Sequence, residues 1–166
     1  MADPELYGLA DQLGQALRQR GLMIATAESC TGGWVAQAVT MVPGSSDWFE
    51  RGFVTYTYIS KREMLGVSGD TLGRDGAVSE QVVREMADGA IARSRAQVAV
   101  AVSGIAGPGG GTLDKPVGTV CFAWRLRDGA AKVVTHKFLG DREAVRRQAV
   151  VCALDGVLRL LGARKA

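Results

Sequence analysis

The residues from Thr26 to Trp34, Thr-Ala-Glu-Ser-Cys-Thr-Gly-Gly-Trp, bring together several groups that could perform nucleophilic chemistry. The segment follows an apolar run over residues 22–25 and precedes an apolar helical pattern. Where a strand turns into a helix, the first backbone N–H groups of the helix are free and favour negative charge. Ser29 can therefore be a nucleophile beside an oxyanion hole, or a simple helix cap. Cys30 can likewise be a thiol nucleophile or a packing neighbour.

A second glycine-rich loop, Ser103 to Gly111, follows the apolar run Val98–Val102. Ligands of open α/β sheets bind beyond the carboxyl ends of the strands, and glycines let a backbone approach a ligand closely. The loop matches neither the dinucleotide fingerprint nor the P-loop. It is either a ligand-binding loop that faces the Ser29 loop across one cleft, or a flexible surface loop.

A serine nucleophile needs a base, and the only histidine, His136, lies in an alternating strand pattern that nothing connects with Ser29. A lysine whose pKa is lowered by burial can serve instead. Lys61 is the candidate, with Tyr56 as the group that orients it and Glu28 as a weaker alternative base. The competing interpretation of Lys61 is an exposed surface lysine.

The composition limits the class of protein. The chain has 166 residues, 47% hydrophobic and 22% charged, which predicts one domain over residues 1–166 with its own core. A net charge of +3 from 20 basic and 17 acidic side chains argues against a nucleic-acid partner. We expect no membrane span, no signal peptide, no cofactor and no metal site. Three cysteines without CxxC spacing favour a reduced, cytoplasmic protein, and a homo-oligomer is left open.

The remaining pattern alternates helices and strands. Helices are expected over 4–20, 31–42, 60–66, 79–93 and 141–161, and strands over 22–27, 49–58, 98–102, 117–125 and 131–138. The last two strands surround the turn signal Arg127-Asp128-Gly129, which predicts a hairpin. This order predicts an α/β fold, a single-domain three-layer α/β/α sandwich with a mixed sheet.

Several of these segments, in this order, resemble the C-terminal domain of the CinA (competence/damage-inducible) proteins. The matching segments are Thr26–Gly33, Pro43–Ser46, Gly52–Tyr56, Gly76–Ser79, Ser103–Pro108, Lys115–Val120, Gly140–Arg142 and Arg146–Gln148. The resemblance implies the same sandwich fold. It also implies hydrolysis of the carboxamide of nicotinamide mononucleotide, a small-molecule nucleotide, to nicotinate mononucleotide and ammonia.

The resemblance further implies roles for individual residues. Ser29 is the nucleophile, and Tyr56 and Lys61 are the proton-transfer pair. The substrate-binding residues are expected among Glu28, Thr31, Gly32, Gly33, Ser103, Gly104, Gly107, Gly109, Gly110, Lys115, Arg142 and Arg146. Thr31, Gly32 and Gly33 would hold the oxyanion, the 104–111 loop and Lys115 would close over the ligand, and the two arginines are candidate phosphate partners.

One stretch departs from the family pattern, which reads Tyr-Ser-Asn-Glu-x-Lys. Here Tyr58 and Ile59 replace the amide and the carboxylate. We expect them to give Lys61 apolar surroundings that lower its pKa. The alternative is a diverged, weakly active or inactive paralogue that binds a nucleotide or a partner on the same fold.

Overall fold

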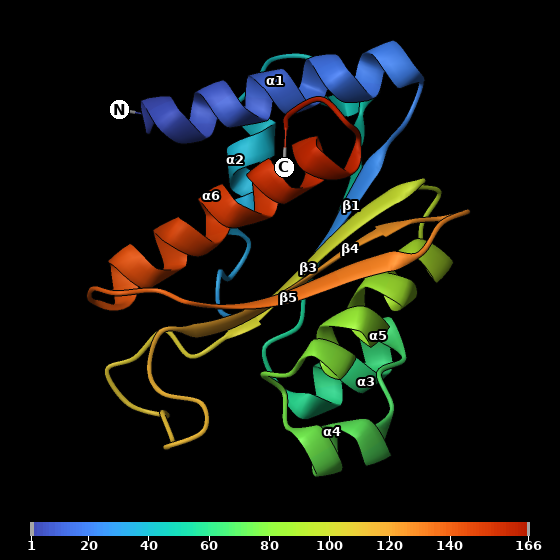
Figure 1. The fold of residues 1–166 in the computed structure, drawn as a ribbon. Coiled ribbons are helices and arrows are strands. Elements are labelled where there is room, and N and C mark those ends of the chain that lie inside the picture. The colour runs from blue at the N-terminus through green and yellow to red at the C-terminus, as the bar shows by residue number, and fades with distance from the viewer. Residues whose placement is uncertain (1, 166) are drawn as a thin grey trace.

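In the computed structural model, which describes residues 2–165, a five-stranded sheet lies between two layers of helices (Figure 1). The strands are β1 (Ile24–Glu28), β2 (Phe49–Val54), β3 (Val98–Gly104), β4 (Thr119–Leu126) and β5 (Ala131–Lys137). Their order is β2-β1-β3-β4-β5. β1 pairs parallel with β2 and β3, whereas β4 pairs antiparallel with β3 and β5. The sheet is therefore mixed, and the predicted fold class and hairpin are confirmed.

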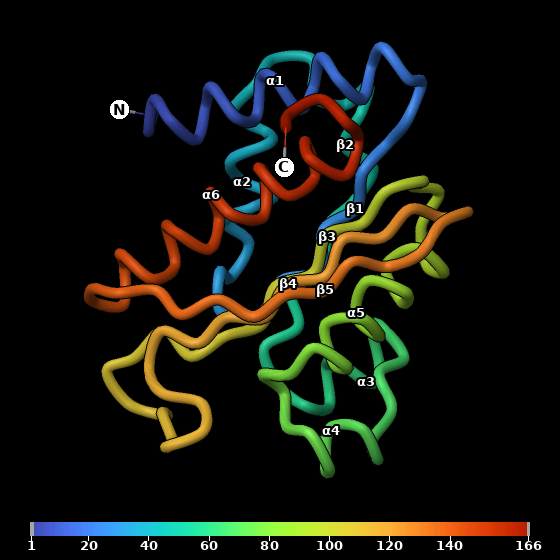
Figure 2. Tube along the Cα trace, in the orientation of Figure 1, coloured from blue at the N-terminus to red at the C-terminus, as the bar shows by residue number. Residues whose placement is uncertain are grey.

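The helices are divided between the two faces of the sheet. One face carries α1 (Pro4–Arg20), α2 (Trp34–Thr40) and α6 (Arg142–Leu160), and the other carries α3 (Tyr58–Leu65), α4 (Gly69–Asp75) and α5 (Glu80–Ala92). Figure 2 shows the strands as a layer between these two groups. A short 3₁₀ helix, Ser45–Asp47, precedes β2. No helix of residues 2–165 combines the length and the apolar character that a membrane crossing requires.

Residues of β1 alternate between the two faces, as a strand period of two requires. Ile24 packs with the α1, α2 and α6 layer, and Ala25 and Ala27 pack with the α3–α5 layer. This alternation directs Glu28 towards α2 and the following residue, Ser29, towards α3. Adjacent residues of one motif thus contact helices on opposite faces of the sheet.

Three expected boundaries were wrong, each for a local reason. The helix expected from Thr31 begins at Trp34, because Gly32 and Gly33 have φ of +61° and +99° and hold the chain in a turn. The strand expected to reach Tyr58 ends at Val54. Thr57, and not Ser60, caps α3 in a capping box, so the helix begins at Tyr58.

Helix α4 was missed altogether. Its sequence Gly-Asp-Thr-Leu-Gly-Arg-Asp contains two glycines and buries only Thr71 and Leu72, which leaves no helical pattern to detect. Ser68 caps it by accepting the Thr71 N–H. Helix α4 and the segment after it, residues 75–79, lie beside the candidate site described below.

Candidate active site

The Ser29 loop and Lys61 meet at the carboxyl end of β1. Ser29 directly follows β1, and its N–H donates to the carbonyl of Val102 on the neighbouring strand β3 at 2.9 Å. Lys61 comes from the first turns of α3, and its Nζ lies 2.9 Å from Ser29 Oγ. Both side chains are buried, with exposed fractions of 8% for Ser29 and 1% for Lys61. Ser29 and Lys61, which lie 32 residues apart in the sequence, are therefore in hydrogen-bond contact.

Burial changes the protonation of this lysine. Loss of hydration disfavours the charged ammonium and lowers the pKa of Lys61 from 10.5 to about 8. Nζ also donates to the carbonyl oxygen of Thr55 at 2.7 Å. In its neutral form the amine can keep that hydrogen bond and direct its lone pair at the serine hydroxyl. Lys61 is therefore positioned and tuned to accept a proton from Ser29 near neutral pH.

Thr55 contacts Lys61 and was missed by the sequence analysis. It acts through its backbone carbonyl, which no side-chain pattern reveals. Its own N–H donates to the carbonyl of Glu28 at 2.8 Å, which ties the end of β2 to the end of β1. Within the described residues no hydrogen bond joins Tyr56 to Lys61, because the Thr55 carbonyl accepts from the amine and the Tyr56 hydroxyl accepts a hydrogen bond from Arg142 Nη2 at 3.0 Å.

Tyr58 and Ile59 are the first two residues of α3, and their exposed fractions are 50% and 64%. The Tyr58 hydroxyl accepts the N–H of Ala77 at 3.3 Å. Both side chains keep much of their surface in solvent, whereas Lys61 is 1% exposed. That these two residues supply the apolar surroundings of Lys61 stays a prediction.

Glu28 caps helix α2, which lies on the opposite face of the sheet from Lys61. Its carboxylate is 1% exposed and accepts hydrogen bonds from Thr31 Oγ1 at 2.6 Å, Val35 N at 2.8 Å and Ala36 N at 3.0 Å. The N-cap of α2 is Gly33, which has no side chain, so Glu28 supplies the cap from the preceding strand. This position leaves Lys61, and not Glu28, as the base next to Ser29.

Three backbone N–H groups of the turn remain available. Within the described residues, the N–H groups of Cys30, Thr31 and Gly33 donate no hydrogen bond, whereas Gly32 N donates to the Ser29 carbonyl at 3.0 Å. Arg146 holds the same turn from α6, with Nε on the Cys30 carbonyl at 3.0 Å and Nη2 on the Thr31 carbonyl at 3.2 Å. Carbonyl groups of the turn are thus held by hydrogen bonds, whereas several of its N–H groups are free to bind a ligand.

Cys30 is the alternative nucleophile, and its environment disfavours the thiolate form. Burial raises the pKa of the Cys30 thiol to about 12. At neutral pH the thiol stays protonated, whereas the adjacent Ser29 hydroxyl has a base within hydrogen-bond distance. The structure therefore favours the serine.

The other candidate binding residues lie around the same end of the sheet. Arg142 joins two segments, since its Nη1 donates to the carbonyl of Gly107 at 2.8 Å and its Nη2 contacts Tyr56. Ser103 Oγ donates to the Ala77 carbonyl at 2.8 Å, and Lys115 Nζ donates to the Asp75 carbonyl at 2.6 Å. These contacts join both ends of the glycine loop to the segment 75–79.

Gly109 and Gly110 lie exposed in the glycine loop, and Gly104 ends β3 in register with Val120. His136 lies on β5, with β3 and β4 between it and β1. At about 4.8 Å between strands this places the histidine strand roughly 14 Å from β1. His136 is therefore outside the Ser29 site, as its strand pattern indicated. Among residues 2–165 no group of three or more His, Cys, Asp or Glu side chains could hold a metal ion.

The fold and the site together define a class: an α/β protein in which a buried lysine contacts a serine at the carboxyl end of a central parallel strand. A comparison with known protein families gives a match over most of the chain. Residues 6–161 match the family described as CinA C-terminal domain, and the chain belongs to that family.

Relatives in this family cover almost the whole chain. The Nicotinamide-nucleotide amidohydrolase PncC of Escherichia coli (strain K12) is 56% identical over 155 residues, which cover 93% of this chain and 94% of that protein. The protein of the same name from Pseudomonas putida is 55% identical over 153 residues, covering 92% and 94%. The crystal structure of competence/damage inducible protein CihA from Agrobacterium tumefaciens superposes with a TM-score of 0.94 at 45% identity, covering 96% of this chain and 98% of that one.

Proposed function

We propose that this chain hydrolyses the carboxamide of nicotinamide mononucleotide to nicotinate mononucleotide and ammonia. Two findings support the reaction. Relatives that bear the name nicotinamide-nucleotide amidohydrolase are 53–56% identical to it over more than nine-tenths of its length. The observation that carries the mechanism is the 2.9 Å contact between Lys61 Nζ and Ser29 Oγ.

In the first half of the reaction, neutral Lys61 takes the Ser29 proton as the serine oxygen attacks the carboxamide carbon. The carbonyl oxygen becomes an oxyanion, which the open N–H groups of Cys30, Thr31 and Gly33 would stabilise. Lys61 then returns its proton to the nitrogen of the substrate. The C–N bond breaks, ammonia leaves, and an ester links Ser29 to the nicotinoyl group.

In the second half, water attacks the ester carbon while Lys61 accepts a proton from that water. The second oxyanion collapses, the C–O bond to Ser29 breaks, and the serine oxygen recovers its proton from Lys61. Nicotinate mononucleotide leaves. Glu28 and Arg146 are positioning residues in this scheme, because they hold the turn that presents Ser29 and the three open N–H groups.

The remaining candidates border the substrate. Tyr56, held by Arg142, would relay the Lys61 proton to the leaving nitrogen, and the loop from Gly104 to Gly110 with Lys115 would close over the nucleotide. Arg142 and Arg146 are the candidate phosphate partners. Each already has backbone acceptors, so a phosphate would use the guanidinium N–H groups that these contacts leave free.

Release of ammonia from nicotinamide mononucleotide by the purified chain tests the function. Ser29→Ala removes the hydroxyl without adding bulk, so the variant should fold and lose activity by several orders of magnitude. Wild-type turnover in that variant would contradict the mechanism. Activity towards simple amides with none towards the nucleotide would contradict the substrate.

A further inference from the structure

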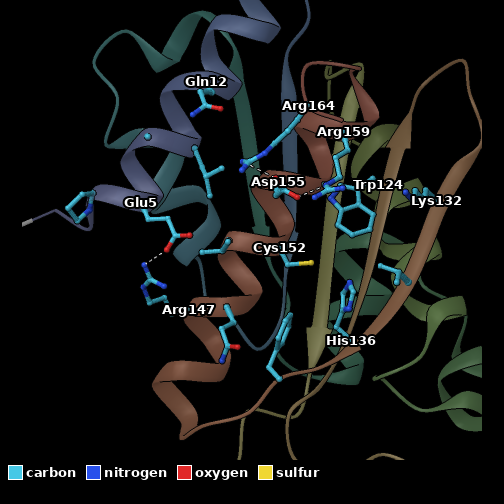
Figure 3. A pocket seen from close by; sticks show the side chains of 18 residues that line it. Glu5, Gln12, Trp124, Lys132, His136, Arg147, Cys152, Asp155, Arg159 and Arg164 are labelled. Atoms are coloured by element: carbon cyan, nitrogen blue, oxygen red, sulfur yellow. Dashed lines mark hydrogen bonds and ion pairs between the residues drawn. The ribbon is translucent and has the colours of Figure 1, made fainter. Parts of the chain in front are cut away.

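A cavity lies away from Ser29, in a groove between α6, the first turns of α1 and the strands β4 and β5 (Figure 3). Its volume is about 950 Å³, within the range of small-molecule sites. The groove forms because α6 packs over β3 and β4 and leaves the same face of the edge strand β5 open. The catalytic lysine approaches the sheet from the opposite face. The proposed reaction uses no residue of this groove.

One wall of the groove is aromatic. Trp124 is buried at its base, where its ring packs against Gly156 of α6 and its Nε1 donates to the Ala153 carbonyl at 3.0 Å. The rings of His136 and Phe138 continue the wall, with centroids 5.7 Å apart. An aromatic wall of this kind favours a planar aromatic body.

The groove carries excess positive charge at one end. Arg159 Nε and Arg164 Nη1 share a single carboxylate, Asp155, at 2.6 Å and 3.0 Å. Lys132 stands beside Trp124 in the strand register, and within the described residues its side chain has no hydrogen bond or ion pair. This end of the groove is thus lined by three cations and one carboxylate, and Figure 3 shows Arg159 and Asp155 beside Trp124. The other arginine of the groove, Arg147, is balanced by Asp3 and Glu5.

We propose that this groove is a second ligand site, for a mononucleotide. The base lies along His136 and Phe138, and the phosphate lies at Lys132, Arg159 and Arg164. An aromatic body joined to a phosphate matches the two ends of the groove, because arginine and lysine donors bind phosphate oxygens through charge-assisted hydrogen bonds. The groove is separate from the Ser29 site, so a ligand can bind in it without being hydrolysed.

Equilibrium binding of adenosine 5′-monophosphate to the intact chain tests the site, because this probe has no carboxamide to hydrolyse. Lys132→Ala should weaken binding about five-fold or more, as loss of one charge-assisted contact would. The matched control is Lys137→Ala, since Lys137 lies on the same strand but on the other face, and it should change affinity less than about two-fold. Adenosine and inorganic phosphate should each bind more weakly than the nucleotide.

The proposal is overturned if the probe does not saturate by about 5 mM, or if Lys132→Ala and Lys137→Ala behave alike. It is also overturned if adenosine binds as tightly as its monophosphate. A dimer that Lys132→Glu dissociates, without nucleotide binding, would assign the groove to a second copy of this chain instead. Ammonia release by Lys132→Ala should equal that of the wild type, so failure of this site and failure of the proposed reaction are separate results.

Discussion

The rate of amide hydrolysis should rise with pH and level off just above pH 8, because the proposed mechanism uses Lys61 as a neutral base. Burial lowers the pKa of this lysine from 10.5 to about 8. At pH 7 about 10% of the lysine is then neutral, against about 0.03% at the ordinary pKa, so burial raises the amount of base about 300-fold. From pH 7 to pH 9 the neutral fraction rises about ten-fold, and kcat/KM for ammonia release should follow it.

Lys61→Met separates this account from other ionisations. The variant should lose the activity and with it the ionisation near pH 8, whereas His136→Ala should keep both. A wild-type profile that is already flat between pH 6 and 7 would refute the reasoning, because it would mean that the base ionises well below the lysine. Loss of the ionisation in His136→Ala would refute the placement of β5 far from Ser29.

The same pKa shift predicts how stability depends on pH. Since the folded pKa lies below the unfolded value of 10.5, the unfolded chain binds more protons between about pH 8 and pH 10.5. The wild type should therefore gain stability relative to Lys61→Met as the pH rises through this window, by about 1.4 kcal/mol per pH unit and about 3 kcal/mol in all. Urea unfolding of both proteins at pH 7.5 and pH 10 measures the difference.

Three further outcomes follow from single contacts. Cys30→Ala should retain most of the ammonia release, because its thiol stays protonated at neutral pH, and an inactive but folded variant would transfer the nucleophile to the thiol. Glu28→Gln places an amide N–H₂ against one of the N–H or O–H donors at the start of α2, so kcat should fall about ten-fold or more with little change in KM. In steady-state kinetics, a raised KM with an unchanged kcat would instead mean that Glu28 contacts the substrate. Gly89→Ala should destabilise the fold by about 1–3 kcal/mol, because a Cβ there would lie against the Leu65 carbonyl oxygen, and thermal unfolding at the wild-type midpoint would contradict that packing.

The sequence by itself predicted the order of the elements and most of the motifs of the site. Helix α1 was delimited correctly because Asp3 and Gly21 are local signals, an N-cap and a left-handed C-cap. The buried runs of β1 and β3 were visible for a similar reason, since a strand covered on both faces is apolar throughout. The Ser29 turn and the glycine loop then followed from their positions after these two strands.

Tertiary structure decided the features that depend on residues distant in sequence. Only the fold shows that α3 brings Lys61 to Ser29, that the Thr55 carbonyl holds its amine, and that burial lowers its pKa. Glu28 was ambiguous as a base until the strand alternation placed it on the α2 side. A hydrogen bond to a backbone carbonyl and the loss of hydration are properties of the folded surroundings, and residue types and spacing along the chain do not encode them individually.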